Sequence, residues 1–146
     1  MGNIPAAVDK LRNYMAWRQS LENIPAQISA LEIQFESLRA SRTDGDTVRE
    51  SAGSKREDIM LNNIALRDAA KANYKIVKRE VKIIENGLAI LSGEERRILE
   101  LFYIQRPTDY VIRLCDELAI EKSELYRRKD KALEKFTRAC FGVVSL

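Results

Sequence analysis

The residues best suited to chemistry form a basic cluster between positions 122 and 131. Its members can donate or accept hydrogen bonds with phosphates and base edges, and they are Lys122, Ser123, Tyr126, Arg127, Arg128, Lys129 and Lys131. Paired hydrogen bonds from arginine to guanine are the commonest specific contact in the DNA major groove, while lysine and tyrosine can hold flanking phosphates. Acidic residues nearby in the sequence cancel only part of the positive charge of this cluster. The cluster predicts contact with double-stranded DNA, with Arg127 as the main candidate, and the alternative is a solvated helix face.

Residues for other kinds of chemistry are scarce. The chain has no histidine, so it lacks the commonest general base and the commonest metal ligand. Cys115 and Cys140 have no Cys-x-x-Cys spacing and stand in apolar contexts, which is typical of reduced core residues. No Gly-rich phosphate loop or Ser-His-Asp set can be assembled. We therefore expect a protein that is not an enzyme and needs no metal and no cofactor.

Composition bounds the fold that must position the basic cluster. The chain has 146 residues, of which 45% are hydrophobic and 32% charged, with only 6 glycines and 3 prolines, and this favours an all-α fold. The net charge of +3 means that any nucleic-acid surface must arise from local clustering. Without a signal-peptide pattern or an apolar run approaching ~20 residues, we expect a cytoplasmic protein that does not enter the membrane.

Residues 1–90 have the pattern of a helical oligomerisation region. Apolar spacing predicts a helix over residues 4–20, and Pro25 predicts a kink or a new helix start near Asn23. A second helix should end near Ala40, because Ile28, Leu31, Phe35 and Leu38 repeat at three and four residues. The polar, glycine-containing stretch 41–54 predicts a loop or hinge.

A third, longer helix should follow the loop. Its predicted seam consists of Ile59, Leu66, Ala70, Val77, Val81, Ile84, Leu88 and Leu91. A helix of roughly 35 residues would measure about 50 Å. Asn63 and Asn73 are assigned to the same seam, where an amide can fix the register of a coiled coil; the alternative is a solvated rim. The earlier helices can fold back on the long one, or the long helix can pair between chains. We expect a homodimer or higher homo-oligomer.

Residues 91–146 predict a set of short helices. Ser92 and Glu95 have capping-box spacing, so a helix should begin near Gly93 and stop before Pro107. A second helix should start near Thr108 or Asp109, and a third near Lys122 after a tight turn. The predicted core positions of these helices are Ile98, Leu99, Phe102, Tyr103, Val111, Leu114, Cys115, Leu118, Leu125, Ala132, Leu133 and Phe136. This order of elements is typical of a helix-turn-helix unit.

Two stretches of this region resemble a known family. Residues 91–103, Leu-Ser-Gly-Glu-Glu-Arg-Arg-Ile-Leu-Glu-Leu-Phe-Tyr, resemble the first helix of region four of bacterial sigma factors, and residues 118–136 resemble its turn and recognition helix. The Tyr-Arg-Arg-Lys run at 126–129, the long preceding helix and the Gly-Asp-Thr-Val-x-x-Ser stretch at 45–51 are closer to phage and prophage transcription regulators of the ArpU and RinA type. The resemblance implies a sigma-like helix-turn-helix that acts at promoter DNA, with RNA polymerase as a possible partner.

The sequence departs from the sigma pattern at two points, and two other functions stay open. Ala119 and Glu121 replace the usual turn and cap, and residues 111–115 replace the usual Glu-Ile-Ala of the second helix. One alternative is a DNA-packaging protein similar to a small terminase subunit, which would form a ring. The other is a sigma-like adaptor that binds proteins and has no affinity for DNA.

Overall fold

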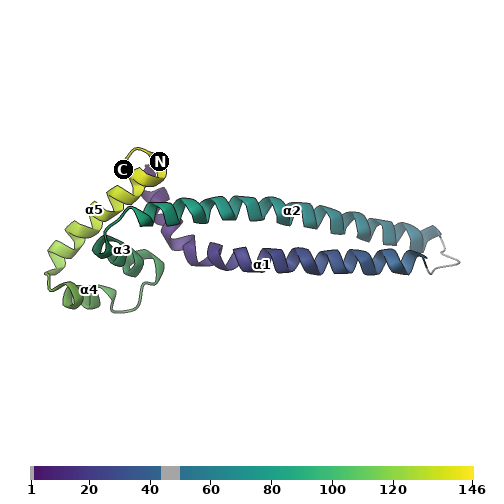
Figure 1. The fold of residues 1–146 in the computed structure, drawn as a ribbon, viewed down its shortest axis with the longest axis horizontal. Coiled ribbons are helices and arrows are strands. Elements are labelled where there is room, and N and C mark those ends of the chain that lie inside the picture. The colour runs from purple at the N-terminus through teal and green to yellow at the C-terminus, as the bar shows by residue number, and fades with distance from the viewer. Residues whose placement is uncertain (1, 44–49) are drawn as a thin grey trace. The chain divides into compact units, whose positions relative to one another are not determined.

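The computed structural model describes residues 2–43 and 50–146, with side chains described for 2–41 and 55–146. Within these ranges all regular elements are helices: α1 (Asn3–Thr43), α2 (Glu50–Ala89), α3 (Gly93–Leu99), the π-helix η1 (Glu100–Ile104), α4 (Tyr110–Leu118) and α5 (Lys122–Phe141) (Figure 1). The predicted all-α class is therefore confirmed for the described part of the chain. The long helices α1 and α2 form an N-terminal hairpin, which short helices follow.

The chain divides into two compact units, and each is described by itself. Residues 19–78 form the hairpin unit, which contains the C-terminal part of α1 and the N-terminal part of α2. Residues 1–18 and 79–146 form the head unit, which joins the start of α1 and the end of α2 with the C-terminal helices.

The seam of the hairpin unit follows alternate spacings of three and four residues on both helices. On α1 it consists of Leu21, Ile24, Ile28, Leu31, Phe35 and Leu38, which are all half-buried. On α2 it consists of Met60, Asn63, Arg67, Ala70, Tyr74 and Val77, which are half-buried or buried. This spacing keeps one stripe of each helix against the other. The sequence left pairing within the chain and pairing between chains open, and the structure shows these two helices paired within the chain.

Two residues of the predicted α2 seam were assigned to the wrong stripe. Ile59 and Leu66 are 49% and 46% exposed, and the polar residues Asn63 and Arg67 take the seam positions instead. The amide nitrogen of Asn63 donates to the carbonyl oxygen of Leu31 at 2.9 Å and to the side-chain oxygen of Gln34 at 3.1 Å. The Arg67 guanidinium lies over the Phe35 ring, 4.7 Å from its centre. Hydrogen bonds and a cation–π contact allow these polar residues to occupy the seam. The spacing of apolar residues in the sequence cannot reveal such contacts, because their partners lie on the other helix.

The predictions for the two asparagines have different outcomes. Asn63 is buried on the seam, as the register-fixing interpretation requires. Asn73 is exposed and lies off the seam, as the rim interpretation requires. The assignment of both to one seam was therefore wrong.

The predicted new helix start near Asn23 is also wrong, because α1 continues through Pro25, whereas the alternative, a kink, stays a prediction. Proline has no N–H and cannot hydrogen bond to the carbonyl four residues earlier, but the apolar seam residues on either side keep the helix paired with α2. The predicted loop at 41–54 is shorter than expected, since residues 41–43 and 50–54 are helical. Residues 44–49 lie outside the described part of the chain.

The core of the head unit draws on both ends of the chain. Its buried residues include Ala7 and Leu11 from α1, Ile84 and Leu88 from α2, and Phe136 from α5. Gly87 lies so close to α5 that a Cβ atom there would sit 2.8 Å from the ring of Phe136. The backbone N–H of Ile4 donates to the carbonyl of Ser145 at 3.1 Å, and Lys10 forms an ion pair with Glu80. These contacts bind the first and last residues of the chain into one unit.

The short helices follow the predicted boundaries. Ser92 and Glu95 form the predicted capping box at the start of α3, and the helical segment ends before Pro107. Its last part is a π-helix, in which the N–H of Gln105 donates to the carbonyl of Glu100 at 2.8 Å. The sequence analysis did not anticipate this wider turn.

Candidate nucleic-acid interface

The candidate interface is built on α4, α5 and the turn between them. Ala119 adopts a left-handed conformation with φ of 54°, and the N–H of Ile120 donates to the carbonyl of Cys115 at 3.1 Å. Leu114 of α4 and Leu125 of α5 are both completely buried, in a cluster with Ile98, Leu101 and Phe102. The tight turn and this shared core fix the first turns of α5 against α4.

Glu121 is the N-cap residue of α5, as its position in the sequence suggested. Its backbone is extended, and its carbonyl accepts a hydrogen bond from the N–H of Leu125 at 3.0 Å. The Glu121 side chain makes no capping hydrogen bond and is exposed. Its negative charge therefore lies in solvent at the start of the helix.

The seven predicted site residues all lie on α5, but they differ in exposure. Five are exposed: Lys122, Ser123, Tyr126, Arg127 and Lys131. The side chains of Arg128 and Lys129 are only 36% and 16% exposed to solvent. The helix thus brings together four exposed or partly exposed cations, Lys122, Arg127, Arg128 and Lys131, with a tyrosine and a serine among them.

Glu124 holds two of these cations. Its carboxylate accepts from Arg127 Nε at 2.7 Å and Nη2 at 2.5 Å, and from Arg128 Nε at 2.9 Å. These hydrogen bonds, first from Arg127 and then from Arg128, lower the pKa of Glu124 to about 2. The same bonds raise the pKa of Arg127. Glu124 is therefore ionised at neutral pH, and it occupies the arginine donors that a phosphate or a guanine would use.

Further ion pairs connect α5 with α3. Arg128 also contacts Glu94, and Lys135 Nζ lies 3.0 Å from the carboxylate of Glu95. Burial tends to raise the pKa of Glu95, but hydrogen bonds from Lys135 and Ser92 outweigh this effect and lower it. Glu95 thus serves both the capping box of α3 and the contact with α5.

Lys129 faces the interior of the head unit more than the solvent. Its ammonium lies 5.8 Å from the ring centre of Phe102 and 5.7 Å from that of Tyr126, and it pairs with Asp130 at 2.7 Å. Burial tends to lower the pKa of Lys129, whereas the hydrogen bond to Asp130 and the nearby Tyr103 raise it above its ordinary value. This lysine holds the aromatic side chains around the start of α5 in place.

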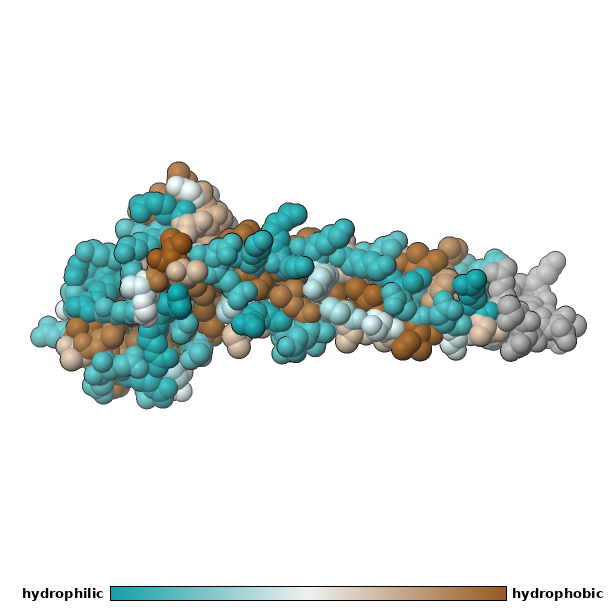
Figure 2. All heavy atoms as spheres, viewed as in Figure 1, coloured by the Kyte–Doolittle hydropathy of each residue, from teal (hydrophilic) through white to brown (hydrophobic). Residues whose placement is uncertain are grey.

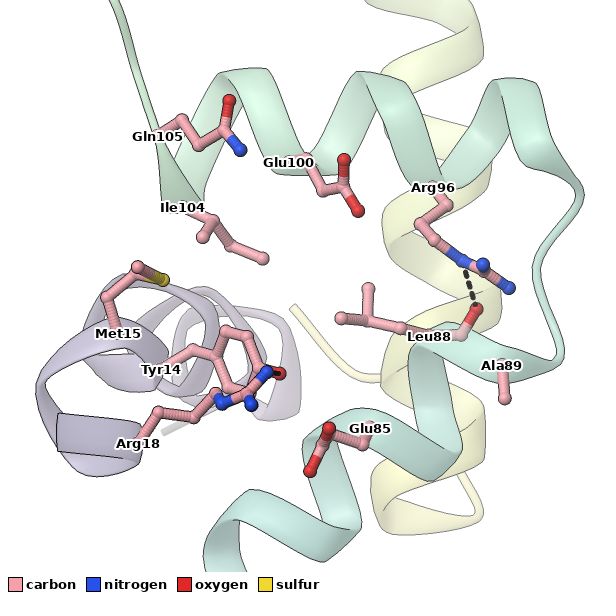
Figure 3. A pocket seen from close by; sticks show the side chains of 10 residues that line it. All are labelled: Tyr14, Met15, Arg18, Glu85, Leu88, Ala89, Arg96, Glu100, Ile104 and Gln105. Carbon is pink, nitrogen blue, oxygen red and sulfur yellow. Dashed lines mark hydrogen bonds between the residues drawn. The ribbon is translucent and has the colours of Figure 1, made fainter. Parts of the chain in front are cut away.

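The head unit also contains a pocket that the sequence analysis did not single out. It has a volume of about 360 Å³, and α1, α2, α3 and η1 contribute to its walls (Figure 3). Arg96 Nε donates to the carbonyl of Leu88 at 3.2 Å, and Arg18 lies 3.4 Å from the hydroxyl of Tyr14. Glu85 and Glu100 also line it. Its residues are widely separated in the sequence, so no local motif could have indicated it.

Cys115 and Cys140 are free and half-buried, and burial raises the pKa of the Cys140 thiol to about 11. In the part of the chain that the structure describes, no cluster of His, Cys, Asp and Glu could hold a metal ion. Among the described helices, none combines the length and the hydropathy that crossing a membrane requires.

Comparison with known proteins identifies no relative. No protein-family model, no curated protein and no solved structure matches this chain.

Proposed function

We propose that the protein is a transcriptional regulator of phage or prophage origin that binds promoter DNA through α4 and α5, used as a helix-turn-helix. In this proposal α5 is the recognition helix and enters the major groove with its N-terminal turns. The resemblance of residues 91–103 and 118–136 to sigma factor region four supports the assignment.

The observation that carries the proposal is the cluster of exposed donors at the start of α5. Arg127 and Lys122 lie beside Ser123 and Tyr126 on solvent-facing positions of the first two turns. Arginine can bond to the O6 and N7 atoms of guanine at once, and the other side chains suit phosphate oxygens. We assign base contact to Arg127, and phosphate contact to Lys122 and Lys131.

In the proposed binding, DNA competes with Glu124 for Arg127 and Arg128. Both guanidinium groups bond to Glu124, so DNA must replace these bonds when it binds. Exposed ion pairs of this kind contribute little to stability, so a duplex with many phosphates can displace them.

The proposal is tested by fluorescence-anisotropy titration against labelled duplexes from the neighbourhood of the gene, at two salt concentrations. We expect salt-sensitive and site-selective binding that Arg127→Ala weakens by about 1–3 kcal/mol, because one base contact is lost. The matched control is Arg138→Ala, which removes an exposed arginine near the other end of α5. It should bind nearly as well as the wild type.

The other outcomes separate the alternative functions. Absence of binding at both salt concentrations would refute the proposal and favour a protein-binding adaptor. Equal losses in Arg127→Ala and Arg138→Ala would refute the assigned role of Arg127. A ring-shaped assembly that binds DNA without site preference would favour a DNA-packaging protein.

A further inference from the structure

Between residues 59 and 76 of α2, one flank of the hairpin unit carries no charge. This flank consists of the residues immediately before each seam residue, and on α2 these are Ile59, Asn62, Leu66, Ala69, Asn73 and Ile76. All six are exposed, with Ile59, Leu66 and Ile76 exposed by 49%, 46% and 58%. The stripe is about 25 Å long at the rise of an α-helix. Many of the other exposed positions of α2 carry charge, among them Asp58, Asp68, Lys71 and Lys75.

The same flank of α1 is also uncharged. The residues before its seam positions include Asn23, Gln27, Ala30 and Gln34, and all four are exposed. Because α1 and α2 run antiparallel, the flank that precedes the seam on one helix lies beside the corresponding flank of the other. The hydrogen bond from Asn63 to Gln34 connects this flank of α1 with the seam of α2. Together they form a surface that we call the uncharged flank.

The opposite side of the hairpin contrasts with it. Residues that directly follow the seam positions include Glu22, Glu32, Glu36 and Arg39 on α1, and Asp68, Lys71, Lys75 and Lys78 on α2. Leu61 and Ile64 are also exposed there and line a hollow together with Phe35, Met60 and Glu57. Figure 2 shows hydrophobic residues at intervals along the surface of the hairpin. Charge therefore divides the two sides of the hairpin unit more clearly than hydrophobicity does.

We propose that the uncharged flank binds the same flank of a second copy of this chain. Two copies that meet in this way bury no unpaired charge, whereas a charged partner would leave its own ions unmatched. The amides of Asn23, Gln27, Asn62 and Asn73 both donate and accept hydrogen bonds, so identical surfaces related by a two-fold axis can satisfy one another. Ile59, Leu66 and Ile76 are removed from water in the same step.

The size of the flank is sufficient for a dimer. Two helices side by side span about 20 Å, so a stripe of about 25 Å gives roughly 1,000 Å² for two copies, which is near the lower limit of specific interfaces. We therefore expect a dimer that dissociates on dilution. This inference does not depend on DNA binding.

The test is sedimentation velocity of the full chain without DNA, over a wide range of concentrations. The wild type should show a monomer–dimer equilibrium. Ala69→Glu places a carboxylate at the centre of the flank opposite its counterpart in the other copy, so it should raise the dissociation constant at least about tenfold. Ala69→Arg should act in the same direction, because its charge is also unmatched.

Ser29→Glu is the control. Ser29 is exposed on α1 and directly follows the seam residue Ile28, so it lies on the side of the hairpin opposite the uncharged flank. This variant should dimerise like the wild type, and circular dichroism should show equal helix content in all variants. A wild type that stays monomeric, an assembly larger than a dimer, or equal weakening by Ala69→Glu and Ser29→Glu would each overturn the proposal. None of these results would alter the test of DNA binding.

Discussion

At the scale of single residues, Glu124 is the side chain that most directly affects the candidate interface. It binds Arg127 with two hydrogen bonds and Arg128 with one, and its lowered pKa keeps it ionised well into the acid range. A duplex that approaches α5 therefore meets a carboxylate among the cations. The carboxylate repels phosphates and must also release the arginines before they can bind DNA.

Replacement of Glu124 by glutamine should raise affinity for DNA. Glu124→Gln removes one negative charge and weakens the hold on both arginines, so we expect about threefold to tenfold tighter binding at low salt, with a smaller gain at high salt. Glu134→Gln removes the same charge from an exposed position further along α5. Anisotropy titration of both variants should show the larger gain for Glu124→Gln, and equal gains would contradict the proposed competition.

At the scale of elements, the hairpin helices tolerate residues that helix propensity or a place on the seam disfavours. Pro25 stands inside α1 although a proline in a helix interior costs about 3 kcal/mol relative to alanine. Asn63 and Arg67 stand on the seam of α2, and the oxygen of the Asn63 amide has no partner there. Tertiary pairing along the whole seam outweighs these local losses, which is why neither helix breaks.

Pro25→Ala should stabilise the hairpin. The alanine restores a backbone hydrogen bond to the carbonyl of Leu21, and part of the gain is offset by the larger entropy of the unfolded chain, so we expect about 1–3 kcal/mol. Ser29→Ala changes an exposed position one turn later and should add only a few tenths of a kcal/mol. Urea unfolding followed by circular dichroism measures both. A loss of stability in Pro25→Ala would show that the proline is favourable at this position.

At the scale of the whole molecule, the head unit is assembled from segments far apart in the sequence. Ile4 bonds to Ser145, Lys10 pairs with Glu80 and also lies 5.5 Å from the ring centre of Phe141, and Gly87 packs closely against Phe136. Residues 91–146 contain the cluster around Leu114 and Leu125, but only part of the buried surface of the unit. The C-terminal helices therefore depend on the start of α1 and the end of α2.

A fragment of residues 91–146 should be much less stable than the same residues in the full chain. Loss of partners such as Leu11, Ile84 and Leu88 exposes apolar surface on α3 and α5, and each large side chain removed from a core lowers stability by roughly 1.5–3 kcal/mol. We expect a broad thermal transition and reduced helix content by circular dichroism. A sharp transition with full helix content would show that residues 91–146 fold on their own.

The sequence by itself determined the local features of this protein. Period and capping signals predicted the all-α class, the capping box at Ser92, the start of α5 at Lys122 and the burial of Leu125, Leu133 and Phe136. These features depend on interactions within a few residues or on one apolar stripe, so they can be read from spacing alone. The positions of the basic residues on α5 follow from the same spacing.

Only the tertiary structure decided which side chains meet across helices. It placed Asn63 and Arg67 on the seam in place of Ile59 and Leu66, carried α1 through Pro25, and turned Lys129 toward Phe102. Each of these outcomes depends on a partner distant in the sequence, whose hydrogen bonds or packing offset an unfavourable local choice. Local propensity weighs about one kcal/mol per residue, and a seam of many contacts outweighs it.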